Sequence, residues 1–237
     1  MKPRCKRRSL VPVVLLRLWL FFIISCFLFK LPSRAEPVLQ DLAQVETTTA
    51  EELELRLDLG QYQEAASQLD SLTQEAKAKP EIMILAARLY IATGRLPLAK
   101  ESLAQYVLLK PTDEHPYLLL GLINGREGKL KDAILMFNKA ISINPRSAKA
   151  YSDRGVAKGA MGNVKESIKD FGKAIALNPR YADAYRNRGI SLESLKDLSA
   201  ACADWRVAAA LGQDDPARWV KDQCKSRSQK KPPQKGG

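Results

Sequence analysis

Residues 171–189 read FGKAIALNPRYADAYRNRG, and residues 137–155 read FNKAISINPRSAKAYSDRG. The two stretches are identical at 12 of 19 positions and begin 34 residues apart. A period of this length is typical of proteins that stack copies of one small structural unit. Shifting the frame by 34 residues in both directions gives five windows without insertion or deletion, namely 46–79, 80–113, 114–147, 148–181 and 182–215.

Each window has the pattern of two helices joined by a tight turn. In 148–181, Val164, Ile168 and Phe171 recur at helical spacing and predict an apolar stripe on the second helix. Four windows have glycine at their fifteenth place, which favours a left-handed end to the first helix. A proline such as Pro179 cannot continue the second helix and stops it. The sequence therefore predicts one elongated array of helical hairpins.

The windows resemble the tetratricopeptide repeat family. The residues that carry the resemblance, with their counterparts in the flanking windows, are Tyr151, Gly155, Gly162, Val164, Phe171, Ala174 and Pro179. The chain departs from the family at Arg154 and Arg188, where leucine is usual, and 46–79 lacks most of the signature. The resemblance implies an all-α fold, a right-handed α-α superhelical solenoid over 46–215.

The carboxyl end carries signals for one more helix. The last repeat helix is expected to end near Leu211, with Gly212 as its cap. Asp215 followed by Pro216 then predicts a helix start, so that 216–224 would cap the array. The basic stretch 225–237 is rich in proline and glycine and has no periodicity, which predicts a disordered tail.

Two cysteines fall in this region. Cys202 and Cys224 are equidistant from residue 213, the middle of the predicted turn, so an antiparallel hairpin would bring them level. An oxidising compartment would then allow a disulfide between them. The alternative is a pair of ordinary buried thiols.

The amino-terminal residues 1–35 have the pattern of an export signal. A basic start precedes the apolar stretch 10–29, and Ser33 and Ala35 form a small-x-small exit. The alternative is an uncleaved anchor that contacts the membrane through 10–29, although Arg17 at mid-span disfavours it. With 36–45 as a linker, the charge bias places the repeats on the non-cytoplasmic side, in a periplasm, a lumen or the extracellular space.

Two weaker signal patterns lie within the same segment. Residues 23–26 resemble a lipoprotein cleavage box, but apolar residues follow it where such proteins turn polar. Arg7 and Arg8 resemble a twin-arginine signal, but the stretch after them is very apolar. Both remain alternatives to an ordinary export signal.

Charge is unevenly distributed along the chain. Residues 1–35 carry eight Lys or Arg and no acid, residues 36–113 carry thirteen acids against seven Lys or Arg, and residues 114–237 carry twenty-three Lys or Arg against thirteen acids. Most of this charge is expected on a solvated outer face, and the alternative is contact with a polyanion or a membrane surface.

No catalytic or metal-binding set is visible in the sequence. His115 is the only histidine and precedes Pro116 at a helix start, which indicates a structural role. The glycines of 125–129 lack the spacing of a phosphate-binding loop and belong to a repeat turn. We therefore expect no enzyme activity, no metal and no cofactor.

By resemblance to the family, the first helices of the repeats line a concave face that binds a partner. Numbering each window from 1 to 34, that face presents places 2, 5, 6, 9, 12 and 13. The predicted partner-binding residues are Ile84, Leu85, Arg88, Leu118, Leu119, Leu122, Arg126, Arg186 and Asn187. An apolar groove with a few cations suits a helix or an extended apolar segment. The alternative is that Leu118, Leu119 and Leu122 only pack against the next repeat.

Three consecutive windows never supply the Lys and Asn set of the family's carboxylate-clamp members, so the sequence disfavours a chaperone-tail clamp. The repeats resemble those of photosynthetic-membrane assembly factors, which implies a scaffold that holds another protein during assembly of a membrane complex. The alternative is a cell-envelope or polyanion adaptor that uses the basic carboxyl half. No nucleic acid is expected as a partner, and the sequence indicates no oligomeric state.

Overall fold

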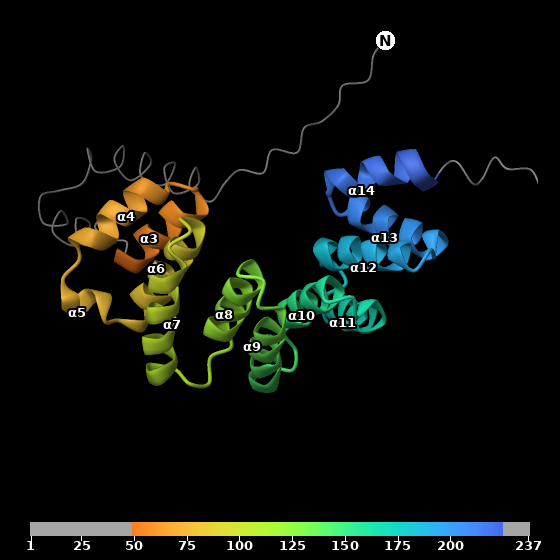
Figure 1. Cartoon of the computed structure of the whole chain (residues 1–237). Helices are drawn as coiled ribbons and strands as arrows, with labels where there is room; N and C mark the ends of the chain where they lie inside the picture. Colours follow the sequence, from red (N-terminus) through yellow and green to blue (C-terminus); the bar gives the residue numbers. More distant parts are fainter. Residues whose placement is uncertain (1–48, 225–237) are drawn as a thin grey trace, which may run out of the picture. The chain divides into compact units, whose positions relative to one another are not determined.

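The computed structural model describes residues 49–224, and every regular element in that range is a helix. From Leu53 onward these residues belong to one compact unit, whose helices follow one another in chain order (Figure 1). The elements are α3 (Thr49–Asp58), α4 (Tyr62–Ser71), α5 (Gln74–Lys77), α6 (Pro80–Ala92), α7 (Leu96–Leu109), α8 (His115–Arg126), α9 (Leu130–Ile143), α10 (Ala148–Ala160), α11 (Val164–Leu177), α12 (Ala182–Ser194), α13 (Leu198–Ala210), α14 (Asp214–Trp219) and the π-helix η2 (Val220–Cys224).

The helices pack as consecutive hairpins. Each window from residue 80 to residue 215 contains one pair of packed helices: α6 with α7, α8 with α9, α10 with α11, and α12 with α13. The second helix of one hairpin contacts the first helix of the next, as α9 contacts α10 and α11 contacts α12. This arrangement confirms the predicted all-α solenoid.

The turn inside each hairpin depends on one left-handed residue at place 15. Glycine holds this place in the first four windows, where φ lies between 71° and 86°. In the fifth window Lys196 adopts the same conformation with φ of 64°. The left-handed conformation at place 15 is therefore present in all five windows, even where a lysine side chain disfavours it.

Close helix contact in the last three hairpins comes from a glycine that faces an aromatic ring. A Cβ on Gly155 in α10 would lie 2.9 Å from Cε1 of Phe171 in α11. The same relationship recurs between Gly121 and Phe137 and between Gly189 and Trp205. These rings are almost fully buried, so place 8 must stay small for place 24 to be large.

The first window differs from the others at its end. Its helices α3 and α4 are followed by the four-residue helix α5, whose first turn is capped by the side chain of Thr73. Lys77 lies in this extra turn, at the place where the next three windows have proline. Both α4 and α5 contact α6, so the window still packs against its successor.

The carboxyl-terminal cap begins earlier than the sequence indicated. The predicted start at Asp215 and Pro216 is wrong, because α14 begins at Asp214 with Gln213 as its N-cap. Gln213 is held there by a hydrogen bond of 2.9 Å from its amide to Oδ1 of Asp183 in α12. Asp215 instead forms an ion pair with Arg218 one turn later. Residues Val220–Cys224 then widen into a π-helix.

Candidate partner-binding surface

Two of the predicted partner-binding residues belong to the core. Leu85 and Leu118 are only 5% and 6% exposed, which corrects their assignment to the surface. Ile84 and Leu119 are half-buried and pack against the cluster around Leu103. Helices α6 and α8 are apolar on several sides, so an apolar residue there does not by itself mark a binding face.

Two predicted cations are used inside the array. Arg88 in α6 bonds to Glu54 at 3.1 Å and to Asp58 at 2.8 Å, both in α3. Arg126 in α8 donates from Nη1 to the backbone oxygen of Ile91 in α6, at 2.9 Å. Both guanidinium groups therefore tie successive repeats together. The charge of Arg88 is compensated by two carboxylates, whereas Arg126 bonds to a neutral carbonyl.

The remaining predicted residues lie on α8 and α12. Leu122 is 39% exposed, and it shares place 9 with Val156 (49% exposed) and Ile190 (44% exposed). These three residues are 34 positions apart and form an exposed apolar row on successive first helices, which we call the place-9 row. Arg186 lies 3.7 Å from Asp183, and Asn187 lines a hollow beside the row.

The hollow lies between α10, α11 and α12 and has a volume of about 370 Å³. Its lining is mostly apolar and includes two members of the place-9 row. The residues that line it are Gly155, Val156, Gly159, Ala160, Val164, Phe171, Asn187, Ile190, Ser191 and Ser194. The sequence interpretation named Gly155 but missed Gly159 and Ala160, although these small residues follow it on the same helix and were a usable signal.

Charges on the first helices near the row are largely compensated. Lys149 and Asp153 pair within α10 at 3.1 Å. Burial raises the pKa of the Asp153 carboxyl, and the neighbouring Asp153 carboxylate raises the pKa of Lys149, whose side chain is largely exposed. Burial also raises the pKa of Tyr181, which precedes α12. The surface is thus close to neutral around an apolar hollow.

His115 takes part in a structural network at the start of α8. Its backbone N–H donates to Oδ1 of Asp113 at 2.9 Å, and its Nδ1 lies 2.6 Å from the same oxygen. The Tyr106 hydroxyl donates to the other oxygen of Asp113. Burial and this hydrogen bond raise the pKa of Tyr106 to about 12. The network fixes the turn between the second and third repeats.

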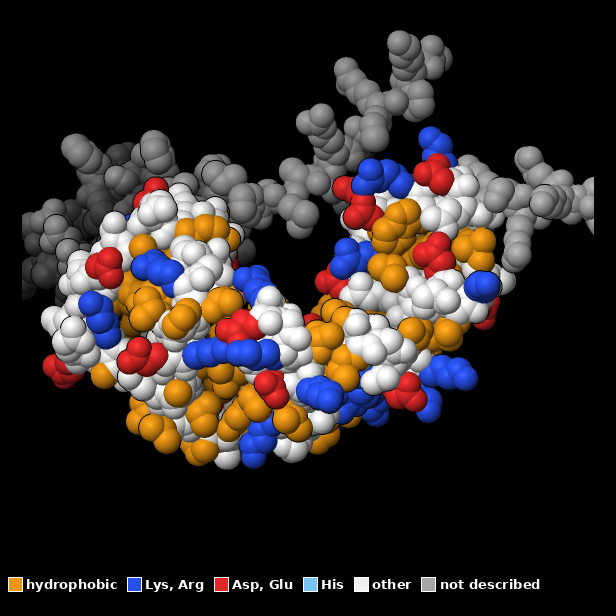
Figure 2. Space-filling view, viewed as in Figure 1, with side chains coloured by type: hydrophobic (Ala, Val, Ile, Leu, Met, Phe, Trp, Pro, Cys, Tyr) orange, Lys and Arg blue, Asp and Glu red, His pale blue; other side chains and the backbone are white. Residues whose placement is uncertain are grey.

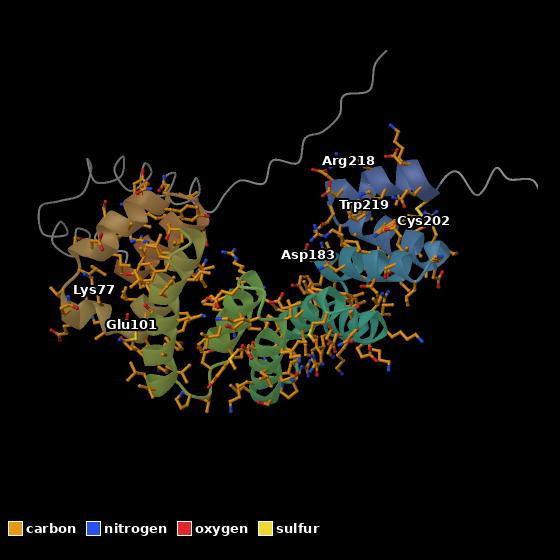
Figure 3. The ribbon with its side chains drawn as sticks, viewed as in Figure 1. Lys77, Glu101, Asp183, Cys202, Arg218 and Trp219 are labelled. Carbon is orange, nitrogen blue, oxygen red and sulfur yellow. A yellow bond between two sulfur atoms is a disulfide. The ribbon has the colours of Figure 1, made fainter. Side chains whose placement is uncertain are left out.

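The structure joins Cys202 of α13 to Cys224 of η2 in a disulfide. The bond has an S–S distance of 1.99 Å and a Cα–Cα distance of 5.8 Å, and it closes a loop with a sequence separation of 22. Trp219, from the same carboxyl-terminal cap, packs on Trp205 with ring centroids 5.1 Å apart. Figure 3 shows Trp219 and Cys202 in this carboxyl-terminal part of the chain. The cap is therefore fastened both by covalent bonding and by aromatic packing.

Residues 49–224 contain no group of three or more His, Cys, Asp or Glu side chains suited to a metal ion. Within the same range, none of the helices has both the length and the apolar character needed to cross a membrane. The predicted export or anchor segment (1–35), the linker (36–45) and the basic tail (225–237) lie outside the described residues.

Comparison with known proteins identifies the family. Family models described as tetratricopeptide repeat match residues 56–123 and 115–147, and one described as TPR repeat matches residues 160–196. The chain belongs to the tetratricopeptide repeat (TPR) family. Tetratricopeptide arrays are interaction modules, so this TPR protein has the architecture of a protein–protein interaction scaffold, a type of protein that is generally not an enzyme.

Solved structures with the fold of this TPR protein include several of MamA. A crystal structure of MamA is 23% identical, with a TM-score of 0.57, over 70% of this chain and 96% of MamA. A second crystal structure of MamA is 22% identical, with a TM-score of 0.55, over 75% and 94% of the two chains. A structure described as the MamA RS-1 ArsTM double mutant is 18% identical, with a TM-score of 0.56, over 69% and 94%. At these identities the likeness shows the fold alone, and no curated protein matches the chain.

Proposed function

We propose that this TPR protein is a scaffold on the non-cytoplasmic side of a membrane. In this proposal it binds a segment of another polypeptide along the place-9 row and holds that partner during assembly of a membrane complex. The observation that carries the proposal is the exposed apolar row of Leu122, Val156 and Ile190 beside a hollow of about 370 Å³.

The lining of the hollow indicates the chemistry of the bound segment. Val156 and Ile190 expose aliphatic surface, so the occupant should insert an aliphatic side chain and bury it. Asn187, Ser191 and Ser194 add uncharged donors and acceptors that can bond to a peptide backbone. A neutral, mostly apolar segment fits this surface better than a charged tail.

Two features support the location. The sequence pattern of residues 1–35 is that of an export signal or anchor. The disulfide between Cys202 and Cys224 would persist in an oxidising compartment and would be rare in a reducing one. Protease added from the non-cytoplasmic side should therefore digest the repeats in intact cells or vesicles, and complete protection would contradict this location.

Site-specific photo-crosslinking tests the binding surface. A crosslinking amino acid at Val156 or Ile190 should trap the same partner in the native host, and mass spectrometry should map the crosslink to an apolar segment. The matched control is Leu135, which is 58% exposed on α9 and does not line the hollow. Equal trapping from Leu135 would contradict the assigned surface.

Affinity measurements with the trapped segment then give the size of the effect. Val156→Glu combined with Ile190→Glu should weaken binding by at least about tenfold, because a charge would replace apolar contacts at the centre of the interface. Leu135→Glu should leave the affinity unchanged. Gly159→Leu should also weaken binding, because its side chain would occupy the hollow. Unchanged affinity in the groove variants would reject the proposal.

A further inference from the structure

A second surface is formed by seven exposed cations on the third and fourth repeats. They lie on the second helices α9 and α11 and at the turns after them, and none of the seven lines the hollow, although Val164 and Phe171 of α11 do. We call this surface the basic face, and its members are Lys131, Lys139, Arg146, Lys165, Lys169, Lys173 and Arg180. Figure 2 shows Lys and Arg side chains gathered along the lower edge of the surface, where α11 lies.

The cations recur with the repeat but are not required by it. Lys131 and Lys165 share place 18, Lys139 and Lys173 share place 26, and the two arginines share place 33. No other window has a cation at any of these places; Glu101, for example, holds the place of Lys169. Since the hairpins without these cations fold in the same way, the basic face has no structural necessity.

The seven cations of the basic face also outnumber the exposed acids of the same helices, Asp132 and Glu166. Other cations of these repeats are paired, as Lys129 is with Glu127 at 2.7 Å and Lys158 is with Asp170 at 2.7 Å. Within residues 49–224, no ion pair involves any of the seven cations of the basic face. Lys139 makes one non-ionic contact, over the ring of Tyr117. The face therefore presents a surplus of positive charge to whatever approaches it.

We propose that the basic face binds the anionic headgroups of a lipid bilayer. The cations are spread over two successive repeats, which matches a charged plane better than a single strand. Leu135 is 58% exposed on α9, at the place where α11 carries Lys169, so an apolar side chain accompanies the charges, as at membrane-surface helices. No aromatic side chain is exposed on α9 or α11, so the face lacks the stacking platform of single-strand nucleic-acid binders.

Membrane contact of this kind goes beyond partner binding and uses different residues. The place-9 row lies on the first helices of the hairpins, whereas the basic face lies on the second helices and the turns that follow. The scaffold can then hold a polypeptide while its other face contacts the bilayer. Variants in one surface should leave the function of the other unchanged.

Vesicle binding of the full chain tests the proposal. The comparison is between vesicles of phosphatidylcholine alone and vesicles in which about one third of the lipid is phosphatidylglycerol. Since each cation near an anionic surface strengthens binding about fivefold, Lys165→Gln with Lys169→Gln and Lys173→Gln should weaken binding to the anionic vesicles on the order of a hundredfold. High salt should have the same effect on the unmodified chain.

The matched control removes three exposed cations elsewhere. Lys79→Gln with Lys110→Gln and Lys221→Gln changes the net charge equally, without touching the basic face. It should weaken binding less than about fivefold, because these residues do not share one face. Both triple variants replace exposed side chains and should unfold at the temperature of the unmodified chain.

Three outcomes would overturn the proposal. The first is equal weakening by both triple variants, which would reduce the effect to net charge. The second is no difference between neutral and anionic vesicles for the unmodified chain, which would assign any binding to the apolar segment 10–29. The third concerns the variant Lys165→Gln with Lys169→Gln and Lys173→Gln. If it lost affinity for an acidic polypeptide or for RNA but bound anionic vesicles as well as the unmodified chain does, the face would be a site for that polyanion. Intact vesicle binding in the Val156→Glu and Ile190→Glu variant separates this test from that of the groove.

Discussion

Arg154 and Asp170 form a two-pronged ion pair inside the fourth repeat. Nε of the arginine lies 2.8 Å from Oδ2 of the aspartate, and Nη2 lies 2.6 Å from Oδ1. The Asp170 side chain is 7% exposed and also receives Lys158 at 2.7 Å. Arg188 and Asp204 repeat the arrangement one window later, with both bonds at 2.7 Å.

Removal of one partner from this pair should be costly. Asp170→Ala leaves Arg154 and Lys158 without their carboxylate and should lower the free energy of unfolding by about 3–5 kcal/mol. Arg154→Leu with Asp170→Met installs the apolar residues that the third repeat has at these places, and should recover most of the loss. Urea unfolding of Arg154→Leu, of Asp170→Met and of the double variant measures the coupling. Additive losses would contradict a direct pair.

Replacement of glycine by alanine should have opposite effects on stability at two positions of α10. Gly155→Ala brings a Cβ to 2.9 Å from Phe171 and should cost about 1–3 kcal/mol of stability. Gly159→Ala meets nothing closer than 3.6 Å, and should stabilise the helix by about 0.4–1 kcal/mol. Thermal unfolding of both variants checks this. Similar shifts in both would show that the ring of Phe171 moves aside.

Loss of the disulfide should loosen the cap. In the chain-entropy description, a loop with a separation of 22 residues contributes roughly 3 kcal/mol. Cys202→Ala with Cys224→Ala should therefore lower the unfolding temperature, and a dithiol reductant should produce a comparable drop in the unmodified chain. The reductant should leave the variant unchanged. If the reductant left the unfolding temperature of the unmodified chain unchanged, the disulfide would contribute nothing to stability.

The Asp113 carboxyl should make the free energy of unfolding depend on pH in the acidic range. Burial opposes ionisation of this carboxyl, but hydrogen bonds from Tyr106 and His115 outweigh burial and lower its pKa. A lowered folded-state pKa stabilises the fold above the unfolded pKa of about 3.9, and this stabilisation is lost as the pH falls through the folded value. Asp113→Asn should therefore be less stable than the unmodified chain near neutral pH, and the difference should shrink on acidification. A difference independent of pH would exclude this linkage.

Lys196 offers a site for stabilisation. Its φ of 64° is costly for a residue with a side chain, and the equivalent place is glycine in the other windows. Lys196→Gly should raise the free energy of unfolding by about 0.5–1 kcal/mol, after the greater entropy of glycine in the unfolded chain is included. The reciprocal change, Gly162→Lys, should lower it. Denaturant titration of both variants decides the sign.

The sequence predicted the fold well because the repeat encodes it locally. The spacing of Gly162, Phe171 and Pro179 marks a turn, a core contact and a stop within one window. Arg154 and Arg188 were visible as departures from the family, but their partners were not identified. Asp170 and Asp204 share place 23 in the same two windows, and comparison of these places would have paired them.

The binding surface was less predictable. In α8 the run around Leu118 and Leu122 is apolar on all sides, so periodicity could not separate the buried leucine from the exposed one. The hollow depends on the distances between α10, α11 and α12. The spacing of residues along one helix does not predict the distances between helices. The start of α14 was misplaced because its N-cap, Gln213, makes no side-chain capping bond to the helix and bonds instead to Asp183, thirty positions away.

The last hairpin closes the array with residues that do not belong to the 34-residue pattern. Trp205 is 1% exposed, because Trp219 and the following turn lie against it where another hairpin would otherwise pack. An added unit would therefore fit between the third, fourth and fifth windows, where α9 contacts α10 and α11 contacts α12 in the same way. A unit added after Leu211 would first have to displace the carboxyl-terminal cap, which the disulfide joins to α13.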